Sequence, residues 1–184
     1  MPNRANLCLI GFMGSGKTTV GQLLAQKLGW KFSDSDREVE LLTGLTIPVL
    51  FAYYGEPYFR FLETVVLRDL TARRAHVIAT GGGAVLTPAN RELLKGSGPV
   101  IWLRASPEEI YARTQTSHGR PLLETVARRE RIAELLAARE EAYASLCDFA
   151  LDVGALTPDE VVMRILSWLN GKKRAGKEGV TGCC

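Results

Sequence analysis

Near the start of the chain, eight residues match a motif that holds phosphate groups. The run GFMGSGKT, from Gly11 to Thr18, has the pattern G-x-x-x-x-G-K-[ST] and follows the apolar run NLCLIG. Glycines in such a loop let backbone N–H groups turn inward around phosphate oxygens, and the following helix adds the partial positive charge of its N-terminus. Lys17 can reach the outer phosphates, and the hydroxyl of Thr18 can coordinate Mg²⁺. The motif predicts nucleotide binding.

Two aspartates one residue apart follow a second apolar run. In KFSDSDREVE, Asp34 and Asp36 lie where a strand is expected to give way to a helix. Residues i and i+2 of a strand point to the same side, and ligands of an open parallel sheet gather beyond the carboxyl ends of its strands. We therefore expect both carboxylates near the terminal phosphate. Asp36 has an alternative role, which is to add favourable negative charge to the first turn of a helix.

Alternating strands and helices are needed to hold these groups. Strands are expected at residues 6–11, 30–34, 75–80 and 99–105. Helices are expected from Lys17 to a cap at Gly29, from a capping box of Ser35 and Glu38, over residues 127–144, and over residues 157–171, where Thr157, Pro158 and Glu160 begin the helix and Gly171 ends it. This alternation predicts an α/β fold of three layers, α/β/α, around a central, mostly parallel sheet.

The bulk composition fits one domain. The chain has 184 residues, of which 46% are hydrophobic, so we assign residues 1–170 to one domain and expect a disordered tail at residues 171–184. The apolar runs are too short to span a bilayer, and the glycine motif leaves no room for a signal peptide, so we expect a cytoplasmic protein without membrane contact. The net charge of +3 is not gathered into a basic block, which argues against nucleic acid as a partner.

Several further runs carry a family resemblance. LIGFMGSGKTTVGQLLAQKLG is followed by FSDSDREVE, GEPYFRFLE, TGGGAVL, GRPLL and REEAY. These runs resemble shikimate kinase in order and spacing, from about Leu7 to Thr157. The phosphate loop occurs in many families, but D-x-D, G-E-x-x-F-R-x-x-E and T-G-G-G in succession are specific. The resemblance implies a P-loop kinase fold that transfers the γ-phosphate of ATP to the 3-hydroxyl of shikimate, with one Mg²⁺ ion. It also implies a short mobile lid at about residues 112–124 and a monomer.

The resemblance also implies a role for individual residues. Asp36 would bind the hydroxyls of shikimate and accept the proton of the attacked one, and Lys17 and Arg120 would stabilise charge on the transferring phosphate. The implied ATP contacts are Gly14, Ser15, Gly16, Lys17, Thr18, Thr19, Arg113 and Arg120. The implied shikimate contacts are Asp36, Arg60, Gly81, Gly82, Gly83 and Arg139. The implied metal ligands are Thr18 and Asp34. Asp34 is the natural carboxylate for Mg²⁺ because the third expected strand does not end in an acid that could hold the metal.

The two arginines assigned to the carboxylate of shikimate differ in support. Arg60 lies one turn before Glu63, which can orient it. Arg139 lies in ARRERIAELLAAREEAYA, a helix rich in both signs of charge, where a solvated arginine is the usual case. Only the REEAY context favours a substrate contact, and this sequence lacks the proline and leucine that more commonly precede the tyrosine. A surface role likewise stays open for Arg120.

Two other functions fit the same residues. A gluconate kinase of the same fold would also use arginine and aspartate, because gluconate is a polyol that carries a carboxylate. A nucleotide-binding regulatory module without catalysis would keep the phosphate loop alone. The presence of Asp34, Asp36, Arg60 and Arg120 together argues against the second alternative.

Overall fold

The computed structural model of the chain describes residues 5–115 and 127–178. Five strands form one sheet in the order β2-β3-β1-β4-β5, and every neighbouring pair is parallel. The strands are β1 (Leu7–Ile10), β2 (Lys31–Asp34), β3 (His76–Ala79), β4 (Val100–Arg104) and β5 (Phe149–Asp152). The helices are α1 (Lys17–Leu28), α2 (Ser35–Thr43), α3 (Ile47–Ala72), α4 (Pro88–Ser97), α5 (Pro107–Thr114), α6 (Arg128–Leu146) and α7 (Pro158–Glu178), with a 3-10 turn η1 (Ala84–Leu86).

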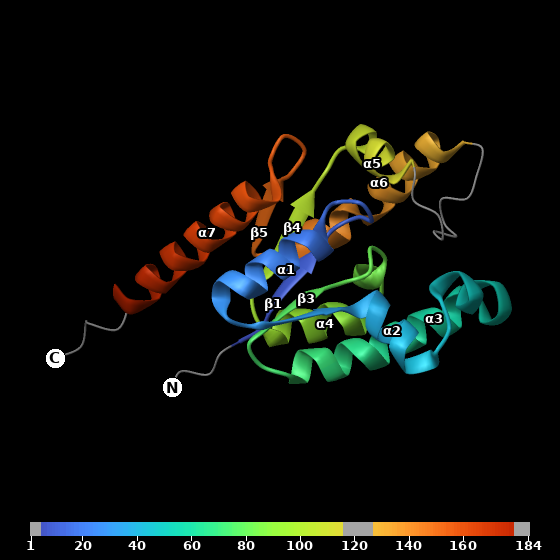
Figure 1. Cartoon of the computed structure of the whole chain (residues 1–184), viewed down its shortest axis with the longest axis horizontal. Helices are drawn as coiled ribbons and strands as arrows, with labels where there is room; N and C mark the ends of the chain where they lie inside the picture. The colour runs from blue at the N-terminus through green and yellow to red at the C-terminus, as the bar shows by residue number, and fades with distance from the viewer. Residues whose placement is uncertain (1–4, 116–126, 179–184) are drawn as a thin grey trace.

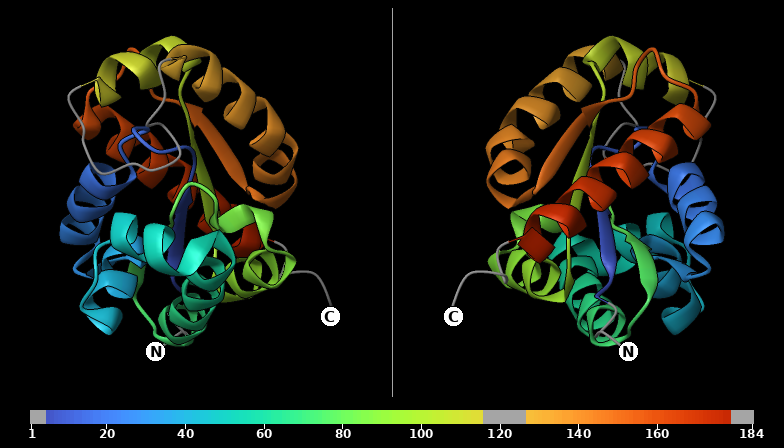
Figure 2. Two further views of the ribbon diagram at one scale, coloured as in Figure 1. Left: turned by 90° about the vertical axis from the view of Figure 1, so that its right-hand side faces the viewer. Right: turned by 90° about the vertical axis from the view of Figure 1, so that its left-hand side faces the viewer.

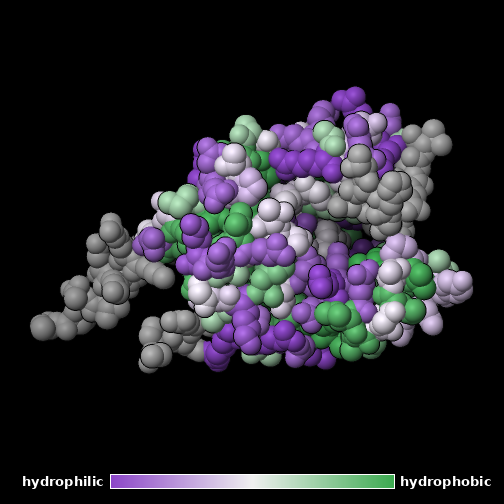
Figure 3. Space-filling view, viewed as in Figure 1, coloured by the Kyte–Doolittle hydropathy of each residue, from purple (hydrophilic) through white to green (hydrophobic). Residues whose placement is uncertain are grey.

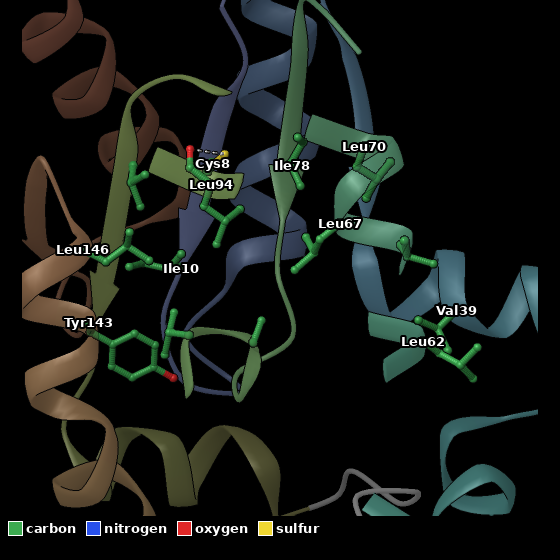
Figure 4. Packing of buried hydrophobic residues seen from close by; sticks show 14 of the residues in the cluster. Cys8, Ile10, Val39, Leu62, Leu67, Leu70, Ile78, Leu94, Tyr143 and Leu146 are labelled. Atoms are coloured by element: carbon green, nitrogen blue, oxygen red, sulfur yellow. Dashed lines mark hydrogen bonds between the residues drawn. The ribbon is translucent and has the colours of Figure 1, made fainter. Parts of the chain in front are cut away.

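Helices cover both faces of this sheet (Figures 1 and 2). Alternate residues of β1 point to opposite faces, so Leu7 and Leu9 pack in a core with α1 and α7. Cys8 and Ile10 pack in a second core with α3, α4 and α6, part of which is shown in Figure 4. A strand that is buried on both faces is typical of a parallel sheet between helices. The predicted three-layer α/β class is confirmed, although the sequence analysis did not predict β5.

The start of helix α2 corrects one sequence prediction. Asp34, not Ser35, is the N-cap, and its Oδ1 accepts a hydrogen bond of 3.1 Å from the backbone N–H of Asp36. Asp34 ends strand β2 with the extended backbone that an N-cap residue needs, so the cap lies one residue earlier than the Ser35 and Glu38 pattern indicated. Asp36 consequently belongs to the first turn of a helix and not to a strand.

The end of helix α7 corrects another prediction. Thr157 and Glu160 form the predicted capping box, with the Thr157 N–H and hydroxyl each donating 2.8 Å bonds to Glu160 Oε2. The helix then passes through Gly171 and continues to Glu178, so the prediction that Gly171 ends it is wrong. A glycine inside a helix costs only about 1 kcal/mol, and the lysines, arginine and alanine that follow favour helix. Of the predicted disordered tail, residues 179–184 lie outside the described residues, and the domain limit at residue 170 stays a prediction.

The long helix α3 changes direction at Gly55. This glycine has φ 78° and ψ 167°, a non-helical conformation with positive φ that glycine adopts readily, and Pro57 follows it. The break turns the second part of α3 along the sheet, where Leu62 and Leu67 pack in the core and Arg60 faces the carboxyl ends of the strands. Within residues 5–115 and 127–178, no helix is both long and apolar enough to cross a membrane.

Candidate active site

A cavity of about 440 Å³ lies beyond the carboxyl ends of β1, β2 and β3. Open parallel sheets bind their ligands at this edge, where the loops of several strands converge. Figure 3 shows the surface hollowed between the lower helices α2 and α3 and the upper helices α5 and α6. The predicted residues that line the cavity are Gly14, Gly16, Lys17, Thr18, Thr19, Asp34, Asp36, Arg60, Gly81, Gly82, Gly83, Arg113 and Arg139. The fold therefore gathers them in one place.

Of the two remaining predicted residues, one is described and does not line the cavity. Ser15 is buried inside the phosphate loop, and its Oγ has no hydrogen-bond partner in the described part of the chain. Arg120 lies outside the described residues, as does most of the predicted lid. The sequence analysis in turn missed the apolar wall of the cavity, which Met13, Ile47, Phe51 and Phe59 supply. The three that lie in α3, Ile47, Phe51 and Phe59, give a weak signal in the sequence, because apolar residues in a helix usually indicate core packing.

The phosphate loop presents backbone donors to the cavity. Gly14 and Gly16 have φ of 80° and 89°, values that are strained for any residue with a side chain. Gly16 caps helix α1 without a side-chain hydrogen bond, so the first N–H groups of the helix stay open toward the cavity. Lys17 Nζ donates bonds of 2.8 Å to the carbonyl oxygens of Gly11 and Phe12. This end of the cavity is suited to an anion.

A pair of hard oxygen ligands lies beside the phosphate loop. The Thr18 hydroxyl donates a hydrogen bond of 2.8 Å to Asp34 Oδ2, and both side chains line the cavity. Mg²⁺ in phosphate-transfer sites is typically bound by one or two protein oxygens together with phosphate oxygens and water. A hydroxyl and a carboxylate at this distance from one another, next to an anion site, fit that ion.

Asp36 has an unusual environment for a carboxylate. Burial, the largest cause, and the neighbouring carboxylates of Glu63 and Asp34 together raise its pKa from 3.8 to about 7, against the opposing effect of Lys17 and Arg60. Its Oδ1 is buried and, within the described residues, has no hydrogen-bond partner. A carboxylate with a pKa near the working pH is well matched to accept a proton from a hydroxyl group.

Arg60 is oriented by two carboxylates of its own helix. Its Nη1 lies 2.9 Å from Glu63 Oε2, as the sequence spacing predicted, and its Nη2 lies 2.9 Å from Glu56 Oε1. Glu63 is fully buried, and its other oxygen, Oε1, has no partner among the described residues. Burial raises the pKa of Glu63, although Arg60 opposes that shift. This ion pair holds the guanidinium at the cavity wall with its position fixed.

Arg139 is buried, with 2% of its surface exposed, so the solvated alternative is wrong. Its guanidinium lies over the ring of Phe12, 5.1 Å from the centroid. Burial lowers its pKa, and in the described part of the chain its Nε and Nη1 have no hydrogen-bond partner. A buried cation with open donors is costly unless it meets an anion. The site is therefore preorganised for an anionic group such as a carboxylate.

The triple glycine makes room for the charged side chains. A Cβ on Gly81 would lie 2.4 Å from Asp36 Oδ1, and one on Gly83 would lie 2.3 Å from Arg60 Nη2. Neither glycine has a positive φ, so space and not backbone conformation requires them. The family resemblance implied that these glycines contact shikimate. The structure shows that they also admit the carboxylate and guanidinium groups of the site.

Arg113 connects two loops at the other end of the cavity. Its Nη2 donates to the carbonyl oxygens of Val153 and Gly154 at 3.1 and 3.3 Å, and its Nη1 lies 3.5 Å from the carbonyl oxygen of Gly14. It thereby joins the phosphate loop to the turn between β5 and α7. The predicted contact with adenine stays a prediction, but Arg113 does lie on the nucleotide side of the cavity.

The fold and the site define a class. A parallel sheet with a phosphate loop, a hydroxyl–carboxylate pair for Mg²⁺ and a separate pocket for an acceptor is the arrangement of a P-loop kinase of small molecules. Residues 13–170 match the sequence profile of the family described as shikimate kinase, and the chain belongs to that family. Shikimate kinases transfer phosphate from ATP to an alcohol group, so this chain is an ATP-dependent phosphotransferase of the aromatic amino acid pathway.

Individual relatives agree with the family. A shikimate kinase of Methylococcus capsulatus is 47% identical over 167 residues, which cover 91% of this chain and 93% of the relative. The solved structure of shikimate kinase from Acinetobacter baumannii in complex with shikimate has a TM-score of 0.90 and 40% identity, and covers 92% of this chain and 95% of that one. A gluconokinase from Sinorhizobium meliloti has a TM-score of 0.61 at 19% identity, which shows a shared fold and no more.

Proposed function

We propose that this chain phosphorylates the 3-hydroxyl of shikimate with ATP, giving shikimate 3-phosphate and ADP. One observation carries the proposal. Within the described residues, the acceptor end of the cavity has buried hydrogen-bond donors and buried hydrogen-bond acceptors that lack partners. Asp36 Oδ1 and Glu63 Oε1 are open acceptors, and Arg139 Nε and Nη1 are open donors. A small ligand with hydroxyls and a carboxylate satisfies both sets, and shikimate is such a ligand.

The acceptor is bound between charged groups of opposite sign. The guanidinium groups of Arg60 and Arg139 face its carboxylate, since two N–H donors of one guanidinium can meet two carboxylate oxygens. Asp36 accepts a hydrogen bond from the hydroxyl to be phosphorylated. The backbone of Gly81, Gly82 and Gly83 approaches the ring. These contacts hold the acceptor in one orientation, which is the main contribution of a kinase to the rate.

The nucleotide is bound at the opposite end. The phosphates of ATP lie against the phosphate loop from Gly14 to Thr19, with Lys17 and the N-terminus of α1 offsetting their charge. Thr18 and Asp34 would hold Mg²⁺, which would supply charge neutralisation at the phosphates. Arg113 lies on the adenine side. Arg120, outside the described residues, is predicted to add a positive charge at the transferring group.

Proton transfer completes the reaction. The 3-hydroxyl oxygen forms a new bond to the γ-phosphorus. At the same time the bond between the γ-phosphorus and the oxygen that bridges the β- and γ-phosphates breaks, and ADP leaves with that oxygen. The hydroxyl proton passes to the Asp36 carboxylate. Because burial and the neighbouring carboxylates raise the pKa of Asp36 to about 7, the group is ionised often enough to accept the proton and basic enough to hold it. A monomer in the cytoplasm, without nucleic acid partners, is predicted to carry out this reaction.

ADP release with ATP and Mg²⁺ tests the proposal in three parallel reactions, with shikimate, with gluconate and without an acceptor. We expect ADP release that depends on shikimate and a phosphorylated product detectable by mass spectrometry. Release with gluconate alone would keep the kinase fold and reject the acceptor. Nucleotide binding without turnover of any acceptor would favour a regulatory module instead.

A further inference from the structure

Two buried hydroxyl groups hold the triple-glycine loop, residues 81–83, from opposite sides. The N–H of Gly81 donates a hydrogen bond of 2.9 Å to Ser35 Oγ, and the hydroxyl of Tyr143 donates one to the carbonyl oxygen of Gly82. Ser35 and Tyr143 are both fully buried. Ser35 lies in the first turn of α2, and Tyr143 lies in α6, 108 residues later in the chain. The loop between β3 and η1 is thus fixed to two helices.

The contact with Ser35 lies directly beside the proposed proton acceptor. Ser35 is bonded to Asp36 in the chain, and the backbone of Gly81 packs so closely on Asp36 that an added Cβ would lie 2.4 Å from Oδ1. A shift of Gly81 therefore moves the surface on which that carboxylate rests. If Ser35 lost its hydroxyl, the buried N–H of Gly81 would have no acceptor at this place, and the loop would have to move to find one.

The contact with Tyr143 lies beside the proposed carboxylate site. Tyr143 is one turn after Arg139 on α6, and Gly82 lies close to Arg139, because an added Cβ on Gly82 would lie 3.6 Å from Nη1. The Tyr143 ring stacks on Trp102 with centroids 5.4 Å apart, and Figure 4 shows it pointing from α6 into the core. Burial raises the pKa of Tyr143 to about 12, so its hydroxyl stays a donor at neutral pH.

From this geometry we propose that Ser35 and Tyr143 are positioning residues for the kinase reaction. Ser35 holds the loop against Asp36 and so sets the geometry of the attacked hydroxyl, whereas Tyr143 holds the loop against Arg139 and so sets the geometry of the bound carboxylate. Neither hydroxyl lines the cavity or touches the reacting atoms. The inference rests on the proposed function, since it concerns how that same acceptor site is held.

Two substitutions separate these roles by their kinetics. Ser35→Ala is expected to lower kcat for shikimate by about tenfold to a hundredfold with a smaller change in KM, because it disturbs groups that act in the transition state. Tyr143→Phe is expected to raise KM for shikimate by about tenfold with a smaller change in kcat, because it disturbs binding. For both variants, KM for ATP stays within about twofold of the wild type.

Matched controls keep the test specific. Ser33→Ala makes the same change at a buried position of β2 outside the cavity lining, and Tyr53→Phe removes a hydroxyl from an exposed side chain of α3. Both controls are expected to keep wild-type kinetics. Ser35→Thr retains the hydroxyl and is expected to restore most of the lost kcat. If Ser35→Ala does not fold, Tyr143→Phe decides the question, since it removes one oxygen and leaves the ring in place.

Three results would overturn the inference. The first is that both variants keep kcat and KM for shikimate within about twofold of the wild type. The second is an equal loss for shikimate and ATP, which would give the two hydroxyls a role in folding alone. The third is a Ser35→Thr variant as slow as Ser35→Ala. A wild-type chain that releases ADP without regard to shikimate would instead reject the proposed function, and the inference with it.

Discussion

The two ends of the cavity differ in the groups that form them: backbone at one end and charged side chains at the other. The nucleotide end consists mainly of backbone: three glycines with positive φ, an open helix N-terminus and one lysine, all within eight consecutive residues. The acceptor end consists of buried and half-buried charged side chains that come from α2, α3 and α6. Backbone donors suit any phosphate, whereas an arrangement of carboxylates and guanidinium groups fits one small acid. On the proposed function, this difference separates general from specific recognition in space.

The acceptor end also carries the energetic cost of the site. A buried atom with no partner in the described residues occurs in each of Asp36, Glu63 and Arg139. Burial raises the pKa of the two carboxyl groups and lowers the pKa of the arginine, so it disfavours the charged form of each. The nucleotide end avoids this cost, because the Lys17 ammonium is satisfied by two loop carbonyls. Substitutions at the two ends should therefore differ in which substrate they affect and in how they change stability.

The largest expected effect comes from Asp36→Asn. The amide keeps the shape of the side chain but cannot accept the hydroxyl proton, so kcat should fall by about a hundredfold to ten-thousandfold. Nucleotide affinity, measured by titration with ADP, should stay unchanged because the nucleotide end is intact. Asp69→Asn, at an exposed ion pair with Arg73 on α3, serves as the control and should keep full activity. Undiminished turnover by Asp36→Asn would remove this carboxylate from the mechanism.

A second substitution should weaken binding and strengthen the fold. Arg139→Met removes a buried cation whose open donors the protein does not satisfy, so KM for shikimate should rise by about a hundredfold or more. The free protein should become more stable by roughly 1–4 kcal/mol, because replacing a poorly satisfied buried charge with an apolar chain of similar length removes a desolvation cost.

Thermal unfolding without ligands measures the second part of this prediction, and steady-state kinetics measures the first. Arg131→Met, at an exposed position of the same helix with an ion pair to Glu134, is the matched control and should change neither quantity by much. A variant that bound shikimate poorly and also unfolded more readily would show that Arg139 supports the helix packing and is not held at a cost for the ligand.

Much of this contrast was visible in the sequence, but unevenly. The phosphate loop could be recognised from eight neighbouring residues, because local conformation alone shapes it. Arg139 could not be placed from its own helix, since a charge-rich amphipathic pattern says nothing about which arginine faces inward. Its burial depends on the packing of α6 against Phe12 and Trp102, which pairs residues far apart in the chain.

Two further failures concern single elements. The cap of α2 was placed one residue late because Asp34 and Ser35 are both good N-cap residues, and only the length of β2 decides between them. Strand β5 was not predicted, although it has four residues and ends in an aspartate just as the predicted strand β2 does. The contact from Ser35 to Gly81 was likewise invisible, since only the pairing of β2 with β3 brings them together.

A moderate effect is expected from pH, with opposite signs for activity and stability. Turnover needs ionised Asp36, whose pKa is about 7, so kcat/KM for shikimate should rise about tenfold per unit as pH increases toward 7 and then level. Stability should change the other way. Because the folded pKa lies above the ordinary value of 3.8, this group's contribution is fully present below about pH 4 and is lost as pH rises through about 7.

Comparison of the wild type with Asp36→Asn isolates both trends. Denaturant titration from pH 5 to pH 8 measures the unfolding free energy of both proteins. The unfolding free energy of the wild type, relative to that of Asp36→Asn, should fall as pH rises. A kcat/KM profile that is flat between pH 5 and pH 7 would contradict the raised pKa of Asp36, and a stability difference that does not depend on pH would do so independently of any assay of activity.

The smallest expected effect distinguishes conformation from space as the reason for a glycine. A Cβ on Gly16 would meet nothing within 4 Å, so Gly16→Ala should only strain a residue with φ of 89° and weaken ATP binding by about fivefold to thirtyfold. A Cβ on Gly83 would press on the Arg60 guanidinium, so Gly83→Ala should instead raise KM for shikimate and leave ATP binding unchanged. Gly96→Ala, on α4 with open space around it, should leave both KM values unchanged. If Gly16→Ala and Gly83→Ala weakened the binding of the same substrate, the two ends of the cavity would not be independent. A strained backbone at one end and a displaced side chain at the other would then have a common effect.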